Sequence, residues 1–149
     1  MRRKIAIAFL AAVAAAPAVA AQTASDACSL LTQAQVSSAV AAQVGPGQYV
    51  TPTFKATCTW VTTGIIVTLM TEGPDPFNAG KRPLSPAMQI VPAGGIGDDA
   101  YYVVIGNMVS LLTKKGGTAF KTSVYCSKLP VATLESMEST LARQVASEL

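Results

Sequence analysis

The sequence contains no histidine, and only 13% of its 149 residues are charged. Without histidine, the usual Ser-His and Cys-His catalytic pairs and histidine metal sites are excluded. The low charge and the 50% apolar content argue against a disordered chain and against a nucleic-acid-binding protein. No apolar run after residue 21 provides the roughly 20 residues that a membrane-spanning helix needs. We therefore expect one domain over residues 22–149.

The first 21 residues have the three regions of a secretory signal peptide. Residues 2–4 are basic, residues 5–16 are uncharged and apolar, and residues 18–20 form an A-x-A cleavage triplet. The alternative, a membrane anchor, would need a longer apolar run. Removing residues 1–21 takes the formal charge from +3 to zero, so charge gives no reason to expect nucleic acid as a partner. We predict a periplasmic or secreted protein with no stable membrane insertion after cleavage.

Three cysteines, Cys28, Cys58 and Cys126, would enter an oxidising compartment on export. They would form one disulfide and leave one free thiol, and three pairings are open. We favour a Cys28–Cys58 disulfide, because it would tie the start of the first helix to an early strand. Cys126 is then expected to be a buried thiol, inert because no histidine is present to activate it.

The mature chain has a pattern of helix, strands and helix. Thr32 and Gln35 have the spacing of a capping box, which predicts a helix that ends at Gly45. An apolar stripe at intervals of three or four predicts a second helix over residues 130–149. Alternating β-branched and aromatic residues, separated by short turns, predict strands at 49–55, 57–62, 65–71, 100–105, 108–115 and 118–126. The expected fold is α+β, with two layers and both helices on one face of an antiparallel sheet of five or six strands. A helix-free sandwich is the alternative.

Residues 72–99 do not fit this pattern, because they are rich in proline and glycine. We expect no regular strand there, and one or two helical turns at Asp75-Pro76 and Ser85-Pro86. So long a connection is often functional, which makes it the candidate partner-binding surface. The alternative is a plain crossover with solvated charges. The candidate contact residues are Phe77, Lys81, Arg82, Met88, Ile90, Asp98 and Asp99.

Other motifs give no cofactor, metal or catalytic site. Residues 95–100 match the letters of the dinucleotide fingerprint G-x-G-x-x-A, but prolines precede them and a β-rich run follows, so we expect a tight turn. Asp98 and Asp99 are consecutive, and neighbouring carboxylates rarely converge on one reacting atom. The methionines are scattered singly, as core residues are.

Three short motifs resemble one group of proteins. They are C-S-L-L-T at 28–32, C-T-W at 58–60 and G-I-G-D-D-A at 95–100. Together they are similar to small exported bacterial domains of unknown function that begin with C-S-L-L-T, many of which are periplasmic or lipoproteins. The resemblance implies the two-layer fold and the Cys28–Cys58 disulfide, and it implies no activity.

These observations predict an exported, non-catalytic binding module that recognises a protein or another component of the cell envelope through residues 72–99. Two alternatives remain. One is an inhibitor or immunity protein that blocks a partner enzyme. The other is a small hydrolase that uses Asp98 or Asp99.

Overall fold

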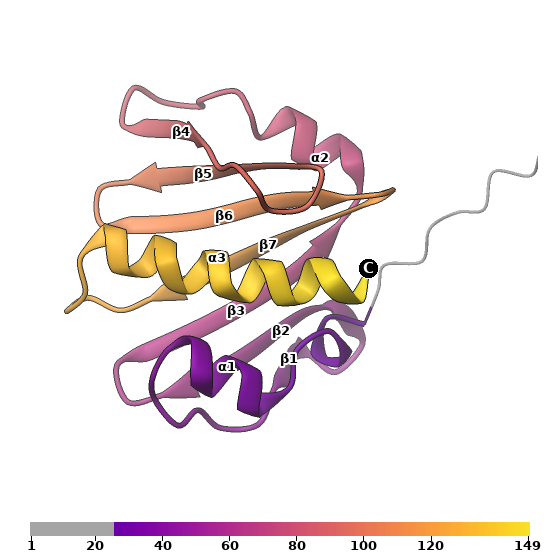
Figure 1. Ribbon diagram of the computed structural model, residues 1–149, viewed down its shortest axis with the longest axis vertical. Helices are drawn as coiled ribbons and strands as arrows, with labels where there is room; N and C mark the ends of the chain where they lie inside the picture. The colour runs from indigo at the N-terminus through magenta and orange to yellow at the C-terminus, as the bar shows by residue number, and fades with distance from the viewer. Residues whose placement is uncertain (1–25) are drawn as a thin grey trace, which may run out of the picture.

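Seven strands form one antiparallel sheet in the computed structural model, which describes residues 26–149 (Figure 1). The order across the sheet is β1-β2-β3-β7-β6-β5-β4. The strands are β1 Gln48–Thr51, β2 Phe54–Thr62, β3 Ile65–Glu72, β4 Met88–Pro92, β5 Asp99–Ile105, β6 Met108–Lys115 and β7 Thr118–Tyr125. The α+β prediction is confirmed, although the sheet is wider than the five or six strands expected. The predicted signal peptide lies outside the described residues.

One face of the sheet, the helix-covered face, packs against η1 (Ala27–Ser29), α1 (Gln33–Ala39) and α3 (Val131–Glu148). Figure 1 shows α3 running across the middle of the sheet with α1 beside it. The prediction that the first and last helices share one face is therefore confirmed. The short helix α2 (Pro74–Ala79) packs on the opposite face, called here the outer face. None of the helices in residues 26–149 combines the length and apolar character needed to cross a membrane.

The predicted capping box at the start of α1 is present. The Gln35 amide donates to Thr32 Oγ1 at 3.2 Å, and the Thr32 amide donates to Gln35 Oε1 at 2.8 Å. The helix ends at Ala39 and not at Gly45, and Ala41 has a φ of 51°. Val44 is still buried against the sheet, because the irregular chain after α1 folds back over the core.

Helix α3 buries its apolar stripe together with one carboxyl group. Leu134, Leu141 and Val145 are buried as expected, and Glu138 is buried beside them. Glu138 Oε1 accepts the amide of Val124 at 2.8 Å. The β6–β7 pairing ends at Leu111 and Thr122, so Glu138 binds a backbone amide at the point where the two strands separate. Burial raises the pKa of Glu138 to about 8, so the carboxyl is mostly protonated at neutral pH.

The predicted disulfide between Cys28 and Cys58 is present, with 5.0 Å between the two Cα atoms. It attaches η1 to β2. Cys126 is the free thiol, as predicted. It is half-buried and not fully buried, because β7 ends at Tyr125 and the chain turns away there.

The expectation that residues 72–99 contain no strand is wrong. Strand β4 pairs with β5 from Met88↔Ile105 to Pro92↔Tyr101, and it forms one edge of the sheet. An edge strand tolerates Pro92 because a strand there needs hydrogen bonds on one side only. The expected helical turn at Asp75-Pro76 is confirmed, since both residues lie in α2.

Candidate functional site

Phe77 anchors α2 to the outer face of the sheet. Its side chain is fully buried and packs against Tyr101, Leu112 and Ala119. The ring centroids of Phe77 and Tyr101 are 5.1 Å apart. The sequence analysis placed Phe77 among the partner contacts. The structure buries it within its own fold, so its side chain is not part of an exposed surface.

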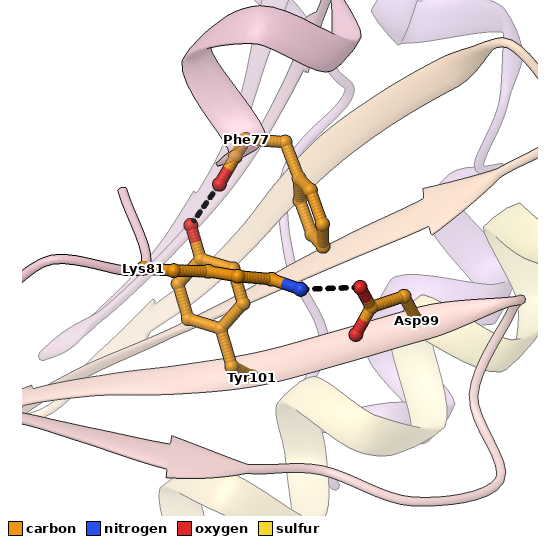
Figure 2. A network of polar contacts seen from close by, with 4 residues as sticks. All are labelled: Phe77, Lys81, Asp99 and Tyr101. Atoms are coloured by element: carbon orange, nitrogen blue, oxygen red, sulfur yellow. Dashed lines mark hydrogen bonds and ion pairs between the residues drawn. The ribbon is translucent and has the colours of Figure 1, made fainter. Parts of the chain in front are cut away.

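Polar contacts complete this anchor (Figure 2). The Tyr101 hydroxyl donates to the carbonyl oxygen of Phe77 at 2.7 Å. Burial raises the pKa of Tyr101 to about 12, so the hydroxyl keeps the proton that it donates. Lys81 pairs with Asp99, and its Nζ lies 5.1 Å from the centroid of the Phe77 ring. These contacts attach α2 and the turn that follows it to β5.

Gly80 allows the Tyr101 hydroxyl to reach the helix. A Cβ at this position would collide with the hydroxyl oxygen of Tyr101. A larger residue would therefore separate the hydroxyl from the Phe77 carbonyl. This is a close approach between two segments, and the sequence alone gives no sign of it.

Asp98 and the turn before β5 are fixed to the β6–β7 hairpin. The Asp98 carboxylate accepts the amide of Gly116 at 2.7 Å and lies 3.2 Å from Lys115 Nζ. These two contacts lower the pKa of Asp98, the backbone hydrogen bond most. Gly97 has a φ of +59°, and a Cβ there would lie 2.5 Å from the Lys114 carbonyl oxygen. Residues 95–100 thus form a tight turn.

The remaining predicted contacts, Arg82 and Met88, lie together around an open cavity. The cavity has a volume of about 250 Å³ and its lining is mainly apolar. Leu84, which the sequence analysis did not single out, also lines it and is 87% exposed. The full lining, called here the Leu84 pocket, is Ala79, Gly80, Arg82, Leu84, Met88 and Val103.

Arg82 is the cation of this pocket. It is exposed, and it has no ion pair in residues 26–149, where the ion pairs are Lys81–Asp99 and Lys115–Asp98. A free guanidinium beside an apolar cavity fits a ligand that combines an apolar group with a carboxylate. The sequence signal for this pocket is Leu84 itself, a large apolar residue in a proline-rich segment between Pro83 and Pro86.

The structure therefore divides the predicted contact residues into two sets. Lys81, Asp98 and Asp99 are paired within the fold, and Ile90 packs beside the Phe77 cluster. Arg82 and Met88 line the Leu84 pocket. Asp98 and Asp99 pair with different lysines at the surface, an arrangement that does not favour the hydrolase alternative.

Residues 26–149 contain no group of three or more His, Cys, Asp or Glu side chains placed to hold a metal ion. Comparison with protein-family models, with curated proteins and with solved structures found no match. The resemblance to C-S-L-L-T domains therefore stays a prediction.

Proposed function

We propose that the protein is an exported, non-catalytic binding module that recognises a secreted or envelope protein through its outer face. The signal-peptide pattern of residues 1–21 supports export, and so does the Cys28–Cys58 disulfide, because such bonds persist in oxidising compartments. Periplasmic or secreted localisation belongs to this proposal.

The observation that carries the proposal is the Leu84 pocket. Leu84 is held in the open although it lies between two anchored segments, α2 and β4. Leu84 and the apolar cavity beside it together form a surface that an apolar group of another molecule can cover. The free guanidinium of Arg82 would orient an acidic group of that molecule.

A photo-crosslinking residue at position 84 tests the proposal in cells that export the protein. We expect a discrete protein adduct from position 84 and none from position 136, an exposed site on α3 used as the matched control. Arg82→Glu should reduce the adduct at position 84. Single substitutions are preferable to a deletion, because residues 72–99 also supply Phe77 and β4 to the fold.

Equal labelling at positions 84 and 136 would show that proteins contact the molecule without preference for this face. No adduct at position 84 in cells that contain the oxidised, exported protein would overturn the proposed function.

A further inference from the structure

Six apolar side chains form one row across the outer face, from β2 to β4. Val61 pairs with Ile66 and Ile66 with Tyr125, while Met108 pairs with Ile105 and Ile105 with Met88. Tyr125 and Met108 join the two halves by lining one small cavity. We call this set the apolar row: Val61, Ile66, Tyr125, Met108, Ile105 and Met88.

The apolar row is open to solvent. Its four members on β2, β3, β7 and β6 are between 42% and 57% exposed, and the other two are half-buried. On β2, β3, β7 and β6 it is bordered on one side by hydroxyl groups, of which Ser110 and Ser123 are hydrogen-bonded at 2.7 Å. On β5 and β4 the bordering residues are Val103 and Ile90, which pack against the Phe77 cluster. On the other side lie the turns at the strand ends. The exposed part of the row, on β2, β3, β7 and β6, is therefore one residue wide.

The shape of the row fits a helix. Two sheets that pack face to face need several apolar rows, whereas an amphipathic helix presents a single apolar stripe. Six strands about 4.8 Å apart make a row of about 24 Å. At a rise of about 1.5 Å per residue, a helix of about 16 residues would cover it.

A cavity lies near the middle of the row. It has a volume of about 120 Å³ and opens between Met108 and Tyr125, with Val109 and Val124 at its walls. It is located where β6 and β7 separate, next to the Val124 amide that Glu138 binds. It offers one socket for an apolar side chain, as helix-binding grooves commonly do.

The charges around the row determine which residues should flank the apolar stripe of that helix. Arg82 precedes Met88 and lines the same pocket, and it has no acidic partner in residues 26–149. The acids of the outer face, Glu72, Asp75 and Asp99, lie at the opposite end of the strands, beside α2. Charge complementarity therefore requires acidic residues beside the apolar stripe of the partner.

We infer that the apolar row is the docking site for an amphipathic helix of a partner protein, with acidic residues flanking its apolar stripe. The inference rests on the proposed function and names the class of partner. A second copy of the chain offers no such helix. The apolar stripes of α1 and α3 are buried in their own fold, so neither is free to dock on another copy.

Binding to synthetic peptides tests the inference. The purified, oxidised protein is titrated with a labelled helical peptide of about 16 residues that has a leucine stripe and glutamate flanks. The matched peptide keeps the stripe and has lysine in place of glutamate. We expect the glutamate peptide to bind at least about tenfold more tightly, a preference that weakens with added salt.

Variants locate the site. Tyr125→Ser combined with Met108→Ser should weaken binding of the glutamate peptide by about tenfold or more. Phe54→Ser is the control, because Phe54 is as exposed as Tyr125, both at 53%, and lies outside the row. Amide chemical shifts should move on β3, β6 and β7 when the peptide is added.

Three outcomes would overturn the inference. They are equal affinity for the two peptides, concentration-dependent dimerisation that Tyr125→Ser abolishes, and binding to vesicles containing anionic phosphatidylglycerol without binding to either peptide. Crosslinking at position 84 in the absence of peptide binding would leave the proposed function standing and remove only the helix as its partner.

Discussion

The two faces of the sheet are covered to different extents. The helix-covered face carries η1, α1 and α3 and holds the main core, whereas the outer face carries α2 over one end only. The other end of the outer face shows the apolar row to solvent. Side chains of the same chemical type thus have different surroundings on the two faces. Stability should depend on the helix-covered face, and contacts with other molecules on the bare part of the outer face.

The largest expected difference in stability is between two variants that each truncate one apolar side chain, one on each face of the sheet. Leu141→Ala, on the helix-covered face, should lower the free energy of unfolding by about 2–5 kcal/mol because it leaves a cavity in the core. Met108→Ala, in the apolar row, should change it by less than about 0.5 kcal/mol. Urea denaturation measures both. Similar losses would mean that the outer face is as well packed as the core.

The Cys28–Cys58 disulfide lies on the helix-covered face, and its removal should give the next largest loss of stability. The bond closes a loop with a sequence separation of 30. Replacing both cysteines by serine should cost about 3 kcal/mol, since the unfolded chain regains the entropy of the open loop. The control is Cys126→Ser, which removes the free thiol. A double variant as stable as the native protein would show that η1 holds its place without the bond.

Glu138 should make the stability depend on pH. Its pKa is about 8 in the folded state and near 4.5 when exposed, so folding takes up a proton between these values. The contribution is fully present below about pH 4.5 and is lost as the pH rises through about 8. From pH 5.5 to 7 the loss should be about 2 kcal/mol, at about 1.4 kcal/mol per pH unit.

Glu138→Gln keeps the shape of the side chain and removes its titration. The free energy of unfolding of the variant should therefore change less over the same pH range than that of the native protein. Glu135, whose charge also raises the pKa of Glu138, remains in both proteins and serves as an internal control. Equal pH dependence in the two proteins would assign the effect to other groups.

The smallest expected change in stability comes from a substitution at the end of the outer face that α2 covers. Gly80→Ala should cost about 1–2 kcal/mol, because the added Cβ displaces the Tyr101 hydroxyl from the Phe77 carbonyl. Gly94→Ala is the matched control, since nothing lies within 4 Å of a Cβ at Gly94. Both are measured by thermal unfolding. If Gly80→Ala is neutral, the turn after α2 adapts more easily than its contacts indicate.

Local signals predicted most of the fold. The capping box of Thr32 and Gln35, the stripe of α3 and the two-residue hairpin turns all act between residues close in sequence. Strand β4 was missed because its five residues include Pro92 and lie in a segment rich in proline. What makes these residues a strand is the edge that β5 offers, and that is a tertiary property.

The candidate site was predicted in part. The sequence drew attention to residues 72–99, and Arg82 and Met88 do line a pocket there. Phe77 is buried, however, because α2 places its ring against the apolar side chains of the outer face. The apolar row could not be predicted, since each member is a single side chain near the end of its strand. Only the register across six strands aligns them.

The pairing of β3 with β7 sets the order in which the fold can be completed. Ile66 pairs with Tyr125, so the centre of the sheet joins an early strand to the last one. A chain synthesised from its N-terminus holds β1, β2 and β3 with an open inner edge until β7 has emerged. Such distant pairing costs loop entropy before it gains contacts, and it slows folding.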